Sequence, residues 1–477
     1  LLKNDGLLPL RKDLRSVAVI GPAADTVSYG DYTETRGRKG GVSVLDGIRA
    51  AVSPETEVLY ERGCNFLGQA LHPFDPSMLR DENGESGLTG HYYNGPVPQG
   101  EPVQVRTDRT VNFNWIFALP HPALDANCFS VVWTGSVVMP RTMDGCIGLS
   151  TQDSMRLYVD DKLLIDGWGK DKSADQALDF HFEAGRTYKI RIEFVNDRRG
   201  ARVIFGYSAG RENFPAAVEA ARKADVAILC MGDNEETSGE NFDRTDLNLP
   251  GRQLELVQAV YATGTPVVLV LQSGRPVTAN WENDHLPAIL EAWFPGEQGG
   301  TAIAKTLFGD AAPGGRLPIT FPRSVGQIPC HYSRRPGGGK RYVEMDWLPL
   351  YPFGYGLTYT TFAYRDMALS RSVIDPQDTV TVSVTVTNTG KYTGDAVPQL
   401  YVRDMFSSVV KPERQLAAFR RLTLAPGESR RVELTVGPKQ LRTLGPDYVW
   451  RVEPGKFELQ LGDNAENILL RADLTVE

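Results

Sequence analysis

The chain has 477 residues, too many for a single hydrophobic core, and we expect about three domains of roughly 150 residues each. Hydrophobic residues make up 41% and charged residues 23%, as in an ordinary globular protein, and no apolar run of about 18 residues predicts a membrane span. The net charge of -8, without a basic stripe that carries aromatic residues, argues against nucleic-acid binding.

The first part of the chain alternates strand and helix patterns. Residues 16–22 (SVAVIGP) predict a strand that ends in a Gly-Pro turn, residues 42–52 have helical spacing, and residues 56–64 predict a second strand. The stretch that follows is rich in Pro, Gly and Asp, which is typical of a linker. We assign residues 1–68 to the first part of an α/β domain and residues 69–86 to a linker.

Between residues 87 and 211 the hydrophobic period changes to two. Short alternating segments are separated by turn residues, for example at residues 128–140 and 187–195. This pattern predicts a β-sandwich. Because domain insertions are tolerated at exposed loop tips, we interpret residues 87–211 as a β domain inserted into the α/β domain.

The helix–strand alternation resumes near residue 214, so residues 212–362 form the second part of the α/β domain. The segment at residues 349–362 (PLYPFGYGLTYTTF) is too apolar for a free linker, and we expect it to pack across a domain surface. Residues 363–477 contain alternating strands whose spacing favours an immunoglobulin-like sandwich.

The cysteines and histidines do not predict a metal site. The five cysteines are odd in number and widely spaced, which favours buried free thiols over a disulfide framework. The six histidines lack HExxH or other paired spacing. We therefore expect no metal, and no Ser/His triad.

Met231–Gly251 (MGDNEETSGENFDRTDLNLPG) contains six carboxylates and one cation, Arg244. It follows an apolar run typical of a buried strand, and open α/β sheets place their chemistry at the carboxyl ends of strands. Neighbouring negative charge and partial burial raise a carboxyl pKa, as a general acid requires. On spacing alone Glu235, Glu236 and Glu240 are equal candidates for that role. A solvated acidic loop without catalytic function is the alternative.

Motifs along nearly the whole chain resemble the C-terminal half of family 3 glycoside hydrolases. They include GENFDR at 239–244, EAWFPGEQGGTAIAKTLFGD at 291–310 and YPFGYGLTYTTF at 351–362. GLTGHYYNG at 87–95 and DSMRLYVDDKLLIDGW at 153–168 resemble a PA14 domain, which some family 3 β-glucosidases carry as an insertion. Residues 363–477 resemble the fibronectin type III-like domain that ends many members.

The resemblance implies a multidomain α/β plus all-β protein. An α/β sandwich is interrupted by a PA14 β-sandwich and followed by a fibronectin type III-like β-sandwich. In the family an N-terminal (β/α)8 barrel carries an aspartate nucleophile and most sugar-binding residues, and this sequence begins where that barrel normally ends. We therefore expect the barrel to be missing from the chain, and a cytoplasmic or periplasmic location is favoured over a secreted one.

The resemblance assigns the general acid/base role to Glu240, the glutamate of a GEGYDR-like motif. Asn241-Phe242 replaces Gly-Tyr in that motif, so the loop conformation is expected to differ. Asp243 and Arg244 are expected to support the loop as a pair. Asp346-Trp347 echoes the family's Asp-Trp nucleophile stretch, but it lies far from any barrel-strand pattern and is not expected to be catalytic.

By analogy with members that carry the insertion, the PA14-like part is expected to overhang the active site and restrict the leaving-group side. Its aromatic residues Trp115, Phe117 and Trp168 are candidates for stacking on substrate, although each type is more often found in a core. Some PA14 domains bind calcium through an adjacent Asp pair. That pair falls at Gln152-Asp153 here, which argues against calcium, and Asp160-Asp161 predicts only a hairpin turn.

The resulting hypothesis is hydrolysis of terminal non-reducing β-D-glucosyl residues with retention of configuration. The substrate is a β-glucoside or small oligosaccharide, water is the co-substrate, no cofactor is needed, and the partner is the family's N-terminal barrel. A non-catalytic glycan-binding module is the alternative, and a barrel on a separate polypeptide is a third. Homodimerisation stays open.

Overall fold

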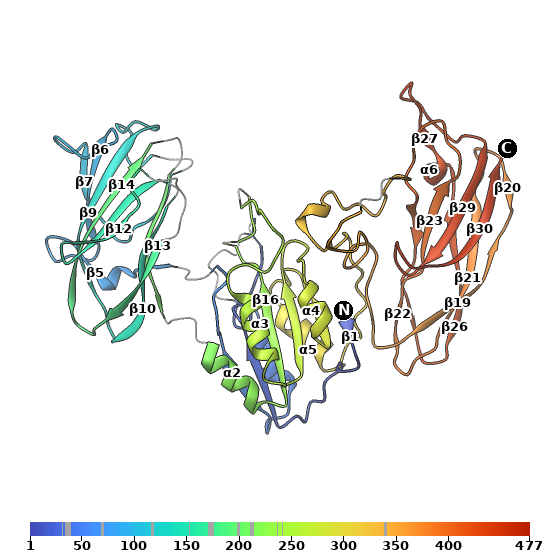
Figure 1. The fold of residues 1–477 in the computed structure, drawn as a ribbon, viewed down its shortest axis with the longest axis horizontal. Coiled ribbons are helices and arrows are strands. Elements are labelled where there is room, and N and C mark those ends of the chain that lie inside the picture. Colours follow the sequence, from blue (N-terminus) through green and yellow to red (C-terminus); the bar gives the residue numbers. More distant parts are fainter. Residues whose placement is uncertain are drawn as a thin grey trace. The chain divides into compact units, whose positions relative to one another are not determined.

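The computed structural model describes residues 1–30, 32–33, 40–67, 71–115, 119–151, 153–169, 176–197, 201–209, 214–235, 237–240, 242–337 and 341–477. These residues form two compact units, Leu67–Asn213 on the one hand and Leu1–Phe66 with Phe214–Glu477 on the other (Figure 1). Among the described residues, no helix is long and apolar enough to cross a membrane.

A six-stranded sheet forms the centre of the α/β part, in the order β1-β18-β17-β16-β2-β3. Neighbouring strands from β18 to β3 run parallel, and the short β1 runs antiparallel to β18 at one edge. The strands are β1 (Lys3–Asn4), β2 (Ser16–Ile20), β3 (Glu57–Glu61), β16 (Val226–Gly232), β17 (Val267–Gln272) and β18 (Ala288–Glu291). The sheet is therefore built from residues on both sides of the inserted unit.

Every residue of β2, β16 and β17 is buried, as expected for a parallel sheet that is covered on both faces. Successive side chains point to opposite faces. Leu229 packs in a core with helices α2 and α3, whereas Ile228 packs in a second core with α1 and α5. The helices are α1 (Val44–Ala51), α2 (Phe214–Lys223), α3 (Gln253–Tyr261), α4 (Asn280–His285) and α5 (Gly299–Leu307).

Helices α1 and α5 approach each other through glycines. A Cβ atom at Gly47 would lie 2.2 Å from the carbonyl oxygen of Gly300, and one at Gly300 would lie 1.9 Å from that of Ser43. Only glycine permits this approach, so Gly300 in the first turn of α5 and Gly47 in α1 serve packing.

The segment after α5 crosses the α/β part as the sequence predicted. The Tyr355 hydroxyl donates to the Leu2 carbonyl at 3.0 Å, the Tyr359 hydroxyl to the Thr306 carbonyl at 2.6 Å, and the Tyr351 hydroxyl to Asn283 Oδ1 at 2.8 Å. A short 3-10 helix, η2 (Val325–Gln327), lies in the preceding stretch. The aromatic residues of this segment thus fasten it to the sheet and its helices.

The C-terminal part is all β, as predicted, and its strands alternate buried and half-buried residues, most clearly in β21 (Val380–Asn388). Two main sheets, β19-β21-β26 and β20-β30-β29-β23-β24, enclose one aliphatic core. The other elements are β19 (Phe362–Leu369), β20 (Val373–Ile374), β22 (Gly394–Ala396), β23 (Gln399–Asp404), β24 (Gln415–Phe419), β25 (Leu422–Leu424), β26 (Ser429–Val436), α6 (Pro438–Leu441), β27 (Thr443–Leu444), β28 (Trp450–Arg451), β29 (Gly455–Gly462) and β30 (Ile468–Val476).

The inserted unit consists of two antiparallel sheets around an aromatic core. One sheet is β13-β10-β15-β4 with β8, and the other is β12-β11-β14-β9-β6-β7 with β5. The strands are β4 (His72–Pro73), β5 (Leu79–Arg80), β6 (Leu88–Asn94), β7 (Gln104–Asp108), β8 (Asn112–Asn114), β9 (Phe129–Val138), β10 (Met143–Thr151), β11 (Ser154–Val159), β12 (Lys162–Asp166), β13 (Gln176–Phe182), β14 (Thr187–Asn196) and β15 (Arg202–Ala209).

The stretch expected to be a linker is partly structured. His72–Pro73 and Leu79–Arg80 form short strands that pair with β15 and β9, and a 3-10 turn, η1 (Pro76–Met78), lies between them. The prolines in this stretch indicated a linker. Pro is nevertheless tolerated in an edge strand, where its missing N–H removes no ladder hydrogen bond.

None of the five cysteines, all of which lie in the described part of the chain, forms a disulfide bond. Cys64, Cys146 and Cys230 are buried, whereas Cys128 and Cys330 are half-buried. Burial raises the pKa of the Cys230 thiol, so this group stays protonated in the core of the α/β sheet.

Candidate active site

The carboxyl ends of β2, β16, β17 and β18 meet at one edge of the parallel sheet, because these strands are consecutive neighbours in it. The loops that leave this edge bring together residues from distant parts of the sequence. The loop after β2 carries Tyr32, the acidic loop after β16 begins at Asp233, and the loop after β17 carries Arg275. Open α/β sheets bind their ligands at such an edge.

Asp233 anchors the acidic loop from inside the protein. Its side chain is 0% exposed, and its Oδ2 atom lies 3.1 Å from Nε of Arg275. Thr237 donates its hydroxyl to Asp233 Oδ1 at 3.1 Å, and Arg275 also donates to the Asn248 carbonyl at 3.0 Å. The ion pair thus ties both ends of the loop to the turn after β17. Burial lowers the pKa of Arg275, although Asp233 opposes that shift.

Glu240 lies on the exposed part of the same loop. Its Oε2 atom accepts a hydrogen bond from the Tyr32 hydroxyl. Tyr32 is itself 80% exposed, and this hydrogen bond raises the pKa of its hydroxyl. The sheet edge therefore presents a carboxylate at the surface with a phenol beside it, within reach of a ligand.

Asp243 and Arg244 do not form the expected pair. Within the described residues, Arg244 makes its ion contact with Asp246, at 3.9 Å, and Asp243 is exposed. Arg244 also lies near enough to Arg275 for the two charges to disfavour each other. The sequence order of the charges suggested the wrong partner, because residues i and i+1 in an irregular loop rarely face each other.

Of the other two carboxylate candidates, Glu235 and Glu236, the structure describes only Glu235. Glu235 is half-buried and lies two residues after Asp233. Glu236 and Asn241 lie outside the described residues. Among the described candidates, Glu240 is the one whose side chain is exposed at the sheet edge.

Glu291, the last residue of β18, adds a second acidic group to this edge. Its Oε1 atom accepts hydrogen bonds from the Trp293 backbone at 2.9 Å and from the Ser273 hydroxyl at 3.4 Å, and its Oε2 atom has no contact with solvent. Burial raises the pKa of Glu291 to about 8. The next residue but one, Trp293, has φ of 54°, a left-handed conformation that is uncommon for an aromatic residue.

The three aromatic residues predicted to contact substrate from the inserted unit do not form a common surface among the described residues. Trp115 is 9% exposed and stacks on Phe113 at 4.7 Å in the core, so its prediction as a substrate contact is wrong. Phe117 lies outside the described residues. Trp168 is half-buried, and the Arg156 guanidinium lies over its ring at 4.7 Å. One face of this indole is therefore already covered.

The acidic pairs considered for calcium do not form a ligand set. In the part of the chain that the structure describes, no three His, Cys, Asp or Glu side chains gather as metal ligands. Asp160 and Asp161 form the predicted turn, with φ of 48° and 63°, and Asp160 Oδ1 accepts from the Lys189 backbone at 2.9 Å. Gln152 lies outside the described residues.

Sequence reasoning missed Tyr32 and the Asp233–Arg275 pair. The signal for Tyr32 was present, since its loop follows β2 and carboxyl ends of adjacent parallel strands share one edge. The loops at residues 22–42 and 273–279 also follow strands of the parallel sheet. They therefore leave the same carboxyl edge as the acidic loop.

Comparison with known protein families now decides the classification. Residues 1–359 match the Glycosyl hydrolase family 3 C-terminal domain, and residues 396–465 match the Fibronectin type III-like domain. The chain belongs to glycoside hydrolase family 3. The predicted family and its C-terminal fibronectin type III-like domain are confirmed, and the assignment of the inserted unit to the PA14 class stays a prediction.

Individual family 3 relatives extend beyond this chain. A beta-glucosidase of Rhizobium radiobacter is 35% identical over 512 residues, which cover 100% of this chain and 61% of the relative. A Beta-xylosidase of Formosa agariphila is 45% identical over 302 residues, which cover 61% of this chain and 42% of the relative. The chain thus spans less than two thirds of the length of either relative.

A solved beta-glucosidase structure is similar in fold to this chain. The beta-glucosidase of Kluyveromyces marxianus superposes with a TM-score of 0.76 at 27% sequence identity, over 100% of this chain and 60% of that protein. The same enzyme has been solved in complex with glucose, with a TM-score of 0.74 and 28% identity.

Proposed function

We propose that this chain supplies the general acid/base of a retaining β-glycosidase that hydrolyses terminal non-reducing β-D-glucosyl residues, and that Glu240 performs this role. The observation that carries the proposal is the exposed Glu240 carboxylate, hydrogen-bonded to Tyr32, at the carboxyl edge of the parallel sheet. Membership of family 3 and relatives named beta-glucosidase support the choice of reaction.

The chemistry requires two carboxyl groups. One attacks the anomeric carbon, while the other protonates the leaving oxygen and later removes a proton from water. Glu240 can reach an incoming glycosidic oxygen because its side chain is exposed. The Tyr32 hydroxyl donates a hydrogen bond to Oε2, which orients the Glu240 carboxyl group at the sheet edge. We propose that the attacking aspartate comes from a (β/α)8 barrel outside this chain, whose surface completes the environment of Glu240.

The inserted unit belongs to the same proposal. We assign it to the PA14 class on the GLTGHYYNG and DSMRLYVDDKLLIDGW motifs, and its two antiparallel sheets around one core are compatible with that class. The structure offers Trp168 as its remaining described aromatic candidate for a glycan, with the ring face opposite Arg156.

The decisive experiment measures turnover of chromogenic β-glucosides by the intact enzyme that contains this chain. Glu240→Gln should lower kcat by about 10²–10⁴-fold, and azide should restore turnover of a substrate with an activated leaving group, because azide replaces the water that needs base catalysis. Glu235→Gln is the matched control and should retain activity within about threefold. The β-xyloside is assayed in parallel, since one relative is named Beta-xylosidase.

The opposite pattern, with Glu235→Gln inactive and Glu240→Gln active, would contradict the assignment of the acid/base. Absence of turnover in unmodified material, with a denatured mass matching 477 residues alone, would favour a non-catalytic glycan-binding module.

A further inference from the structure

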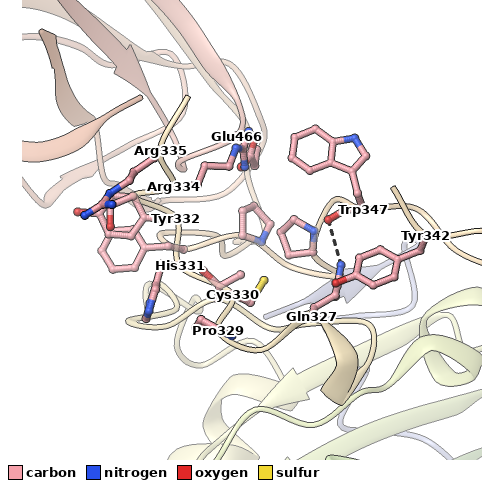
Figure 2. A pocket seen from close by; sticks show the side chains of 15 residues that line it. Gln327, Pro329, Cys330, His331, Tyr332, Arg334, Arg335, Tyr342, Trp347 and Glu466 are labelled. Atoms are coloured by element: carbon pink, nitrogen blue, oxygen red, sulfur yellow. Dashed lines mark hydrogen bonds and ion pairs between the residues drawn. The ribbon is translucent and has the colours of Figure 1, made fainter. Parts of the chain in front are cut away.

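A cavity of about 440 Å³ lies in the larger unit, and Tyr32, Asp233, Glu240 and Arg275 are not among the residues that line it (Figure 2). It is lined by residues between Thr320 and Arg335, by residues between Tyr342 and Phe353, and by Glu466 of the C-terminal β part. Cavities that bind small molecules measure about 300–1,000 Å³, so the volume suffices for one or two sugar rings. None of its lining residues takes part in the proposed hydrolysis.

Close contacts fix the walls of this cavity. The guanidinium of Arg334 contacts Glu466 at 2.6 Å and Glu413 at 3.2 Å, and it lies over the Trp347 ring at 4.6 Å. The Tyr332 ring stacks on Phe353 at 4.2 Å. These contacts join the irregular segment to the C-terminal β part, so the lining is preformed.

The two sides of the cavity differ in chemistry. Figure 2 shows His331, Tyr332 and Arg335 along one side, and Tyr342 and Trp347 along the other. Proline and aromatic rings complete the wall, which gives it flat apolar surfaces. An occupant should therefore combine a polar or charged group with an apolar ring face.

The lining contains a cationic side chain and several groups that can donate hydrogen bonds. The Glu466 carboxylate is already engaged by Arg334 and lies 3.7 Å from Arg414. Arg335 is exposed, and the structure gives its guanidinium no partner within the described chain. The side chains of His331, Ser333 and Thr320 likewise have no hydrogen-bond partner among the described residues. The cavity thus keeps one positive charge and several donors for a ligand.

We propose that this cavity binds a hexuronic acid, either free or at the end of an oligosaccharide. The carboxylate pairs with the fork of Arg335, because guanidinium groups bind carboxylates through two parallel hydrogen bonds. Ring hydroxyl oxygens accept from Ser333 and His331. The C–H face of the ring lies against the proline and aromatic rings that line the cavity wall. This assignment does not depend on the proposed hydrolytic function.

Isothermal titration calorimetry of the full chain with D-glucuronate tests the proposal. D-Glucose has the ring without the carboxylate, and acetate and sulfate have the charge without the ring. We expect saturable binding of glucuronate at least tenfold tighter than of each of these three. Arg335→Gln should weaken glucuronate binding at least tenfold, and Arg335→Lys, which keeps the charge but loses the fork, should weaken it less.

The matched control is Arg365→Gln. Arg365 is also exposed and has no side-chain partner among the described residues, but it lies on β19 outside the cavity. It should leave the affinity unchanged, and thermal unfolding should show that all three variants fold. Absence of saturable binding, equal binding of sulfate, or glucuronate binding that survives Arg335→Gln would each overturn the proposal. The last result would also reveal binding at another site, such as a sugar subsite.

Discussion

The α/β part and the inserted unit place their charged groups differently. In the α/β part the central strands are mostly apolar, and carboxylates appear at the carboxyl ends of the strands or in the loops that follow, at Asp233, Glu240 and Glu291. In the inserted unit a carboxylate lies inside the core. Asp108, 5% exposed, accepts hydrogen bonds from Trp133 Nε1 at 2.7 Å, Arg106 Nε at 2.7 Å and Tyr92 Oη at 2.5 Å.

The difference separates two uses of buried charge. A carboxylate that is satisfied on all sides, such as Asp108, fixes the positions of the large rings around it but cannot bind anything else. Of the carboxylates at the sheet edge, Glu240 is exposed to solvent, where a ligand can reach it, whereas Asp233 is buried against Arg275. Stability should therefore depend most on Asp108, and activity most on the edge.

The largest effect on stability should come from Asp108→Ala. This change leaves Arg106, Tyr92 and the indole N–H of Trp133 without their shared acceptor in the core, and should lower the stability of the inserted unit by about 3–5 kcal/mol. Urea unfolding, with amide exchange in β6, β9 and β14 to locate the change, measures it. Glu183→Ala breaks an exposed pair with Arg186 and should cost less than about 1 kcal/mol. Equal losses for the two variants would mean that the Asp108 network does not stabilise the core.

The next effect, at the sheet edge, depends on pH. Burial raises the pKa of Glu291 from 4.5 to about 8, so above pH 4.5 the folded protein holds a proton that the unfolded chain has lost. Its contribution to stability is therefore complete below pH 4.5 and falls as the pH rises toward 8, by at most about 1.4 kcal/mol per pH unit. Glu291→Gln, which cannot ionise, should flatten this part of the stability–pH curve.

Glu297→Gln serves as the control for Glu291, because Glu297 lies in the same loop but is exposed. Its unfolding curve should keep the slope of the unmodified protein. If the unfolding free energies of Glu291→Gln and of the unmodified protein have the same slope between pH 5 and 8, Glu291 is ionised in the folded state. The expected pKa shift of Glu291 would then be contradicted.

The smallest effect concerns Tyr32, and it presupposes the proposed hydrolysis. Tyr32→Phe removes the hydrogen bond to Glu240 and should lower kcat about three- to tenfold with little change in KM, because the carboxylate is oriented less well. The loss should shrink for a dinitrophenyl glucoside, whose leaving group needs little acid catalysis. Tyr29→Phe, which removes a hydrogen bond to the Gly40 carbonyl in the same loop, should leave both constants unchanged. An equal loss with both leaving groups would indicate general damage to the loop.

Much of the fold was predictable because its signals are local. Apolar runs such as residues 226–232 indicate strands of a covered parallel sheet, and the alternation in residues 380–388 indicates a half-buried antiparallel strand. The short strands at residues 72–73 and 79–80 were not predictable from local sequence. They form by pairing with β15 and β9, which lie far from them in the sequence.

The site was predictable only in part, for a related reason. The composition of the acidic loop indicates a candidate site, and the family motif assigns the acid/base role to Glu240. The partners of these groups come from other loops: Tyr32 from the loop after β2, and Arg275 from the loop after β17. Trp115 was misjudged because a tryptophan in a strand-rich segment has the same appearance in a core and on a binding surface, and only its stacking on Phe113 decides between them.

The pairing of β2 with β16 also determines the order in which the molecule can form. Val17 lies opposite Val226 in the sheet, yet the whole inserted unit is synthesised between them. During translation the parallel sheet cannot close until β16 has left the ribosome, whereas residues 67–213 already hold all the contacts of their own core. Long-range parallel pairing is slow, and a folded insert shortens the loop that must close. The inserted unit is therefore the first part of the chain able to reach its native fold, and the α/β sheet assembles around its completed ends.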